Sequence, residues 1–339
     1  MGATVIVDAF WGDSGKGKIG AYVAARDQVD FCVRAGTGTN AGHSLYLDGD
    51  KRIAVNQMPL SGIQTTAELR VGSGVALDPR KLIREMDDYE SCYNLKQRTK
   101  VDYRCPVVLP EYIAREQADV HLRDRVGSTG TGTGVALAEF RLRRAIQAKD
   151  CPELRPFCCD VATELNRACA AGKQVVVEGS QGTFLSLALT ADYPFCTSDN
   201  CTTAAFVDDV GLNWQYIDDV VLVVKTIPSR IGSGPLPSEM SIAEQDRRGI
   251  REYGVTTGRR RRKASQISWE HLQQAVMLNG PTQIALTFCD HFDPDIRDQR
   301  QLSPRVRALI KKIERVADTP VTIVETGKRF DSIFEPARQ

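Results

Sequence analysis

Residues 11–19, Trp-Gly-Asp-Ser-Gly-Lys-Gly-Lys-Ile, combine the residue types best suited to chemistry on a phosphate group. The glycines leave backbone N–H groups free to point at an anion, and the two lysines add positive charge. Asp13 lies among them, although a carboxylate repels phosphate, which indicates that it holds Mg²⁺ or moves a proton. The alternative is a tight turn from a strand into a helix, with both lysines in solvent.

The same stretch departs from the P-loop pattern G-x-x-x-x-G-K-[ST] at one position. Gly12, Gly17 and Lys18 match the pattern, but Ile19 stands where a metal-binding hydroxyl is needed. The sequence therefore argues against an ordinary P-loop NTPase and favours Asp13 as the metal ligand.

A second glycine-rich loop, residues 34–43, ends in His43, one of only four histidines in the chain. Beside a phosphate-binding loop, a histidine can protonate a leaving oxygen or stabilise a phosphoryl group in transfer. A capping or solvent-facing histidine explains the residue equally well. The loop alone leaves both interpretations open.

Three later segments offer hydroxyl and amide groups suited to phosphates and base edges. They are residues 127–134, 178–183 and 193–198. The first runs into a predicted helix that carries the arginines of residues 141–144, and its alternative is a flexible linker. Each segment is a weak signal when taken alone.

The strongest charge feature is the basic run 259–263, which follows Val255-Thr-Thr-Gly258. A basic run can bind nucleic acid, but no aromatic residues are interleaved with this one and the chain as a whole is not basic. Arginine pairs with carboxylates through two parallel hydrogen bonds. The segment 256–259 therefore favours a clamp on a small carboxylate.

The elements that must position these loops alternate along the chain. The expected strands are Ala3–Ala9, Phe31–Arg34, Val107–Leu109, Gln174–Glu178, Val220–Lys225, Ile284–Cys289 and Val321–Val324. The expected helices include Pro79–Tyr89, Leu137–Ala148 and Val161–Ala171. This alternation predicts an α/β fold with a largely parallel central sheet covered by helices, and such sheets bind ligands beyond the carboxyl ends of their strands.

Composition limits the classes of function. The 339 residues carry a net charge of +1, which gives no overall field for nucleic acid or an anionic membrane. We expect a single domain over residues 1–339, no membrane span and no secretory leader. Ten scattered cysteines without a metal-binding spacing are typical of reduced thiols, so we expect a cytoplasmic protein, in the host cytoplasm if it is viral.

Taken together and in order, these motifs resemble those of the adenylosuccinate synthetases. The matching segments are residues 11–18, 40–43, 128–130, 178–183, 193–198, 230–239 and 255–262. The resemblance extends from residue 3 to about residue 333. That family phosphorylates O6 of a 6-oxopurine nucleotide with a nucleoside triphosphate, and the amine of L-aspartate then displaces the phosphate. The resemblance thus implies a ligase that forms a C–N bond.

The resemblance also implies roles at the reacting centre. Asp13 would remove the N1 proton of the purine and bind Mg²⁺, and the carbonyl of Gly42 would complete the metal site. His43 would stabilise the phosphoryl group in transfer and then the 6-phosphoryl leaving group. Lys16 would neutralise the phosphates.

Further residues carried over from the family fall into three binding sites. Those expected at the nucleotide monophosphate are Asn40, Ser128, Thr129, Arg143, Gln181, Thr197 and Arg259. Those expected at L-aspartate are Thr256, Thr257, Arg259 and Arg261. Those expected at the triphosphate are Ser14, Gly15, Lys16, Gly17, Lys18, Asp290, Gly327 and Lys328. Arg143 matches an arginine that reaches into the other subunit, which implies a homodimer.

The sequence also departs from the family pattern. The departures are Ser14 for glutamate, Thr131 for arginine, Val135 for proline, Phe288 for a frequent lysine, a missing tryptophan after the arginine run, and the segment Cys196–Cys201. Together they are similar to a bacteriophage branch that makes precursors of 2-aminoadenine and accepts dGMP in place of IMP. Replacing glutamate by Ser14 removes bulk and charge, which would help to admit the exocyclic amine of guanine.

Three functional hypotheses follow. The favoured one is the phage-type reaction of dGMP, L-aspartate and ATP or dATP, giving N6-succino-2-amino-2′-deoxyadenylate. The second is the ordinary reaction of IMP, L-aspartate and GTP, for which Asp290 would suit the guanine of the donor. The third is a nucleotide-binding regulator without catalysis, which the presence of Asp13 and His43 disfavours.

Overall fold

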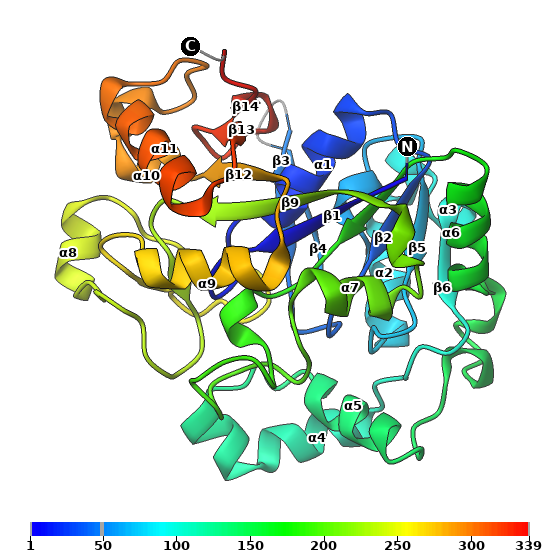
Figure 1. The fold of residues 1–339 in the computed structure, drawn as a ribbon. Coiled ribbons are helices and arrows are strands. Elements are labelled where there is room, and N and C mark those ends of the chain that lie inside the picture. The colour runs from blue at the N-terminus through cyan, green and yellow to red at the C-terminus, as the bar shows by residue number, and fades with distance from the viewer. Residues whose placement is uncertain (1, 48–50, 338–339) are drawn as a thin grey trace.

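The computed structural model describes residues 2–47 and 51–337 (Figure 1). Its main feature is a ten-stranded sheet in which neighbouring strands are parallel, except for the last pair, β13 and β14. In spatial order the strands are β14 (Ile333–Phe334), β13 (Val321–Glu325), β12 (Gln283–Thr287), β9 (Ile217–Lys225), β1 (Ala3–Asp8), β8 (Val175–Glu178), β2 (Phe31–Arg34), β5 (Glu68–Val71), β6 (Thr99–Asp102) and β7 (Cys158–Cys159). The expected α/β class with a largely parallel sheet is confirmed.

Helices cover both faces of this sheet, and two short antiparallel pairs lie outside it. In chain order the helices are α1 (Lys16–Arg26), α2 (Pro79–Tyr93), α3 (Leu95–Arg98), α4 (Pro110–Ala118), α5 (Thr133–Arg141), α6 (Val161–Ala170), α7 (Thr203–Asp209), α8 (Ile242–Arg247), α9 (Trp269–Asn279), α10 (Cys289–Phe292) and α11 (Pro304–Ala317). Of these, α4, α5 and α8 lie away from the sheet (Figure 1). The short pairs are β3 (His43–Tyr46) with β4 (Arg52–Val55), and β10 (Ser229–Arg230) with β11 (Arg262–Lys263).

The sheet is buried on both faces, which explains why its central strands are continuous apolar runs. In β1, Val5 and Val7 belong to a core shared with α6, α9 and α11, whereas Ile6 belongs to a core shared with α1 and α2. All three side chains are fully buried. The first strand is therefore fixed from both sides, and so is the loop that follows it.

Two predicted helices begin where their sequences supply a cap. The side chain of Asp78 accepts a hydrogen bond from the amide of Lys81 at 3.2 Å, and Pro79 fills the first turn of α2. Asp160 accepts from the amide of Thr163 at 3.1 Å at the start of α6. These caps satisfy amides that have no partner within the helix.

Three predicted boundaries are wrong. Residues 107–109 form no strand of the sheet, because Val107 makes only an isolated bridge to Leu77 before α4 begins. The helix predicted over residues 137–148 is instead α5, which ends at Arg141. Arg143 has φ +63° and so lies in a turn and not on a helix. Strand β12 ends at Thr287, because Phe288 has φ +56° and α10 follows.

Among the described residues 2–47 and 51–337, no helix is both long enough and apolar enough to span a membrane. Their ten cysteines are free, and most of them are buried. The single domain expected over residues 1–339 stays a prediction.

Candidate active site

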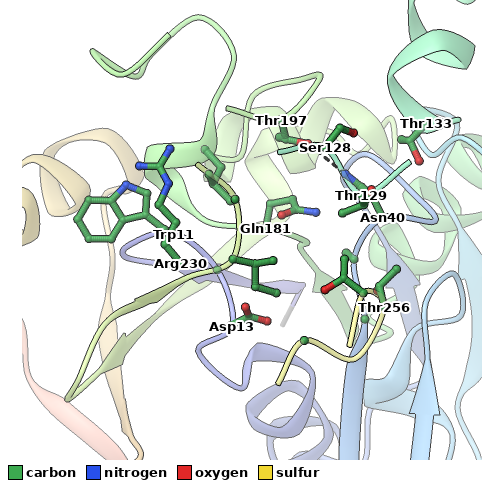
Figure 2. Close-up of a pocket in the computed structure, with 18 of the residues that line it drawn as sticks. Trp11, Asp13, Asn40, Ser128, Thr129, Thr133, Gln181, Thr197, Arg230 and Thr256 are labelled. Atoms are coloured by element: carbon green, nitrogen blue, oxygen red, sulfur yellow. Dashed lines mark hydrogen bonds between the residues drawn. The ribbon is translucent and has the colours of Figure 1, made fainter. Parts of the chain in front are cut away.

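A cavity of about 1340 Å³ opens where β1, β8 and β2 end, at the edge of the sheet where the sequence placed the ligand site (Figure 2). Most of the predicted site residues line it, although they are far apart in the sequence. They are Asp13, Ser14, Gly15, Lys16, Gly17, Lys18, Asn40, Gly42, His43, Ser128, Thr129, Gln181, Thr197, Thr256, Thr257, Arg261 and Lys328. A cavity of this size exceeds what a single drug-sized ligand needs.

Four predicted site residues do not line this cavity. Arg143 is exposed in the turn after α5, and Arg259 is exposed with its Nη1 donating to the Gly127 carbonyl at 3.1 Å. Asp290 is buried with Oδ2 3.4 Å from Arg297 Nε, and the carbonyl of Gly327 accepts from a lysine at the cavity wall. The function of Arg143 across a homodimer stays a prediction.

The glycine-rich loop 11–15 leads into the N-terminus of α1. Gly15 stands at the N-cap with φ +85° and no side chain caps the helix, so its first amides are free for an anion. Lys16 Nζ lies 3.3 Å from Asp8 Oδ2 and 2.5 Å from the Gln181 carbonyl. Lys18 Nζ lies 2.7 Å from Glu325 Oε1. Both lysines are buried, so a turn with lysines in solvent is wrong.

Asp13 is held by cations on two sides. Its φ is +56°, and its backbone carbonyl accepts a hydrogen bond from Lys225 Nζ at 3.0 Å. Its Oδ1 lies 2.9 Å from Arg261 Nη2. The carboxylate is therefore fixed at the cavity wall by the same arginine that the sequence placed at the L-aspartate substrate.

The residues around Asp13 fit a Mg²⁺ ion that is held mostly by phosphate. No cluster of three or more histidine, cysteine, aspartate or glutamate side chains that could hold a metal occurs in residues 2–47 and 51–337. Mg²⁺ in nucleotide sites usually takes one or two protein carboxylates and completes its shell with phosphate oxygens and water. Asp13 and Gly42 both line the cavity, so one carboxylate and one carbonyl are available there, which suits that pattern.

A buried ionic cluster beneath Asp13 was not predicted from the sequence. Glu252 accepts from Lys225 Nζ at 2.8 Å and from Arg261 Nη1 at 3.0 Å, and Lys263 Nζ lies 3.0 Å from its other oxygen. Burial opposes ionisation of Glu252, but the three cations outweigh it and hold its pKa well below the usual range. Burial, with Lys225 nearby, lowers the pKa of Lys263 to about 7. The only sequence signal was that Lys263 ends the basic run.

His43 is buried against charged partners. Its Nδ1 lies 2.5 Å from Glu178 Oε1, and Nη1 of Arg34 lies 2.9 Å from the same oxygen. Burial lowers the pKa of His43 to about 4, and Arg34 adds to this lowering although Glu178 opposes it. The ring is therefore neutral at pH 7, and the capping or solvent-facing interpretation is wrong.

The position of His43 depends on Gly17. A Cβ atom at residue 17 would lie 2.8 Å from His43 Cβ, which is too close for both side chains to keep their places. We expect Gly17→Ala to lower kcat by about 10–100-fold through displacement of the ring. Steady-state kinetics measures the loss. Gly20→Ala is the matched control, because it gains the same helix propensity of about 1 kcal/mol while its Cβ meets Ser61 Cβ at 3.2 Å. Equal losses in both variants would contradict the explanation.

Hydroxyl and amide groups gather on a part of the cavity wall away from Asp13. Asn40 Nδ2 donates to Thr197 Oγ1 at 3.2 Å, and Ser128 Oγ donates to Glu116. The hydroxyls of Thr129, Thr131, Thr133 and Thr39 form a chain with steps of 2.9–3.2 Å. Figure 2 shows the labelled members of this set near one another, with Gln181 between them and Asp13. The wall suits a sugar phosphate, which offers many acceptors.

Arg230 supports this wall and was not singled out from the sequence. Its side chain is almost fully buried and donates to Asp192 Oδ2 at 3.1 Å, to the Pro235 carbonyl at 2.7 Å and to the Phe195 carbonyl. Arg230 therefore stabilises the turn over residues 192–195, just before Thr197. The motif 230–239 carried the family resemblance, but nothing in its spacing indicated this function.

Phe288 is a cavity-lining residue, whereas Asp290, two residues further along the chain, is buried outside the lining. Lys225 Nζ stands 4.2 Å from the centre of the Phe288 ring, and Phe288 lines the cavity. Asp290 Oδ1 is buried and has no hydrogen-bond partner among the described residues. A flat apolar ring in the cavity, with an unpaired acceptor two residues away in the chain, suits a purine base that carries N–H donors.

The chain is similar in sequence to known adenylosuccinate synthetases. The family model described as adenylosuccinate synthetase matches residues 5–154 and 149–295. The adenylosuccinate synthetase of Thermococcus onnurineus (strain NA1) is 40% identical over 338 residues, which covers 99% of this chain and 98% of that one. The corresponding enzyme of Methanocaldococcus jannaschii is 41% identical over 335 residues, which covers 98% and 96%.

Two solved structures have the same fold as this chain. A fully ligated adenylosuccinate synthetase from Plasmodium falciparum superposes with a TM-score of 0.89 at 19% identity and covers 99% of this chain and all of that one. A cyanophage S-2L succinoaminodeoxyadenylate synthetase, bound to dGMP and to dATP as energy donor, superposes with a TM-score of 0.80 at 26% identity and covers 99% and 96%. The chain therefore belongs to the adenylosuccinate synthetase family, whose members are ligases that form a C–N bond between aspartate and a purine nucleotide.

Proposed function

We propose that this chain joins L-aspartate to C6 of a 6-oxopurine nucleotide monophosphate through a 6-phosphoryl intermediate. The observation that carries the proposal is the meeting of three features in one cavity: the open N-terminus of α1, the Asp13 carboxylate and the buried His43 ring. An anion site beside a base and an imidazole suits phosphoryl transfer to an oxygen.

In the first step Asp13 takes the N1 proton of the purine, and O6 attacks the γ-phosphoryl group of the donor. The free amides of α1 and the charge of Lys16 offset the negative charge that develops on the phosphates. His43 contacts the phosphoryl group in transfer. Mg²⁺, held by Asp13 and the Gly42 carbonyl, would neutralise further phosphate charge when bound. The nucleoside diphosphate is the first product.

In the second step the amine of L-aspartate attacks C6, and phosphate leaves from the same carbon. Thr256, Thr257 and Arg261 line the cavity and would hold the two carboxylates of L-aspartate. Arg259 would join them by turning its side chain from the Gly127 carbonyl toward the cavity. Arg261 already binds a carboxylate, that of Asp13, so it has the geometry for this role and must be shared between enzyme and substrate. The products are the succinylated nucleotide and phosphate.

The comparisons support IMP and GTP as the substrates better than the dGMP reaction that the sequence departures favoured. The archaeal adenylosuccinate synthetases are 38–41% identical over nearly the whole chain. The unpaired acceptor of Asp290 also suits the N1 and N2 donors of a guanine base in GTP. IMP with GTP is the first candidate.

One observation favours dGMP as a second candidate. Ser14 is buried at the cavity wall, and its hydroxyl has no partner among the described residues. A buried polar group without a partner costs about 1–3 kcal/mol, and the exocyclic amine of guanine would supply a donor. The cyanophage synthetase that superposes on this chain was solved with dGMP and dATP.

The deciding experiment pairs IMP or dGMP with each of GTP, ATP and dATP, in the presence of Mg²⁺ and L-aspartate, and detects the succinylated nucleotide by mass spectrometry. Product from IMP with GTP alone is the expected result for the first candidate. Product from dGMP supports the second, and no product from any pair contradicts the ligase proposal.

Two substitutions test the function of Ser14. If Ser14 admits guanine, Ser14→Glu should lower kcat/KM for dGMP relative to IMP by at least about 10-fold, because a larger charged group refills the space. Ser14→Ala keeps the space but removes the hydroxyl, so it separates volume from hydrogen bonding. An unchanged ratio in both variants would show that residue 14 does not set the base specificity.

A further inference from the structure

We propose that Glu178, itself held by Arg34, is a positioning residue that keeps the His43 proton on Nδ1 and holds the ring in one orientation. The proposal rests on the proposed function, in which His43 contacts the phosphoryl group. Neither Glu178 nor Arg34 lines the cavity, so each would act only through His43.

The two residues face each other across neighbouring parallel strands. Arg34 ends β2 and Glu178 ends β8, and the two are register partners. Both side chains are fully buried. Glu178 Oε1 accepts from His43 Nδ1 at 2.5 Å and from Arg34 Nη1 at 2.9 Å, while Oε2 accepts from the Ser61 amide at 2.6 Å. A carboxylate held by three donors cannot rotate freely.

The contact with Glu178 favours one tautomer of His43. Glu178 Oε1 can only accept, so a ring nitrogen 2.5 Å away must carry the proton. Arg34 Nη1 can only donate, and it lies 3.3 Å from Nε2, which suits an unprotonated nitrogen. Nη1 also lies 2.7 Å from Nδ1. A bare Nδ1 would suit that contact, but it would place two acceptors 2.5 Å apart, so the Nδ1–H form is the better match.

The ring is also confined from the other side. His43 Cβ stands so close to the first turn of α1 that only glycine fits at residue 17. The carboxylate of Glu178 lies against the same helix, where a Cβ at Gly20 would be 3.9 Å from its Oε2. The ring is thus fixed between a helix and an oriented carboxylate. Carboxylates orient catalytic and metal-binding histidines in this way, and their removal costs about 10–100-fold or more.

The first test reads the tautomer directly in the wild-type protein. Only four histidines are present, so two-bond ¹H–¹⁵N spectra of ¹⁵N-histidine protein resolve their rings, and loss of a signal in His43→Asn assigns His43. We expect Nδ1 protonated and Nε2 bare. A proton on Nε2 would overturn the proposal. Because no turnover is measured, this result stands even if the ligase assay fails.

The second test asks whether Glu178 acts through His43. We expect Glu178→Gln to lower kcat by about 100-fold, with KM for the monophosphate changed by less than about threefold. In a His43→Asn background the same substitution should cost no more than about threefold, because residues that act as a unit are not additive. Losses that multiply in the double variant would overturn the proposal.

A second arginine–glutamate pair supplies the control for this test. Arg70 is another buried arginine, bound through Nε and Nη2 to Glu164 at 2.7 Å, and that pair does not line the cavity. Glu164→Gln should change kcat by less than about twofold and leave the His43 tautomer unchanged. If Glu178→Gln does not fold, Glu178→Asp enters the same cycle, since it keeps the charge but shortens the reach.

Discussion

Replacing Asp13 by asparagine should lower kcat by about 10²–10⁴-fold while leaving nucleotide binding within about threefold of the wild type. Asparagine has the shape of aspartate but cannot take the N1 proton of a purine. The backbone carbonyl of residue 13 keeps its hydrogen bond from Lys225, so the loop should keep its backbone conformation. Turnover and equilibrium dialysis with the monophosphate measure the two quantities separately.

A second aspartate supplies the control. Asp246 also pairs with an arginine, with Oδ1 2.6 Å from Arg260 Nη2, but it does not line the large cavity. Asp246→Asn should therefore leave kcat within about twofold, as expected for a partly exposed ion pair. If Asp13→Asn kept more than a tenth of the wild-type turnover, the base would have to be sought elsewhere.

The largest effect on stability should follow from Glu252→Gln. This substitution leaves Lys225, Arg261 and Lys263 buried together without their shared carboxylate, and breaking a buried pair from one side costs about 3–5 kcal/mol. Urea unfolding measures the free energy of unfolding. Glu239→Gln is the control: Glu239 pairs with Arg262 at a partly exposed site, so its loss should cost no more than about 1 kcal/mol. Equal losses in both variants would show that the buried cluster adds no stability of its own.

The pKa of Glu252 gives this stability a pH dependence with a definite sign. Because its pKa is lower in the folded state than in the unfolded chain, the contribution is present above the ordinary glutamate pKa of about 4.3. It is lost as the pH falls from there through the folded-state pKa. Unfolding in urea at several pH values should thus show a steeper acid loss in the wild type than in Glu252→Gln, and parallel curves would contradict this.

The sequence was most informative where burial or backbone geometry dictates residue type. Strands β1, β8 and β9 were predicted because buried parallel strands need apolar runs on both faces. The strand β5, Glu-Leu-Arg-Val, was missed because its Arg70 is buried with Glu164, a partner 94 residues away. No local sequence pattern predicts an ion pair with a residue so far along the chain.

Only part of the candidate site could be predicted from the sequence. The glycine-rich loops and their polar side chains were visible, because free amides and unusual φ angles demand particular residues. The contact of Arg261 with both Asp13 and Glu252 was not, since it depends on how three segments meet. Arg143 was placed on a helix because its neighbours favour one, yet its φ of +63° puts it in a turn.

The central position of β1 has a consequence for how the protein is made. Its two neighbours in the sheet are β8, where Ala3 pairs with Val175, and β9, where Val7 pairs with Leu222. Strand β1 therefore leaves the ribosome about 170 residues before either of its partners exists. Pairings between such distant segments make folding slow. The loop that would bind phosphate follows β1 directly, yet it can take its shape only after β9, about 200 residues later, has been translated.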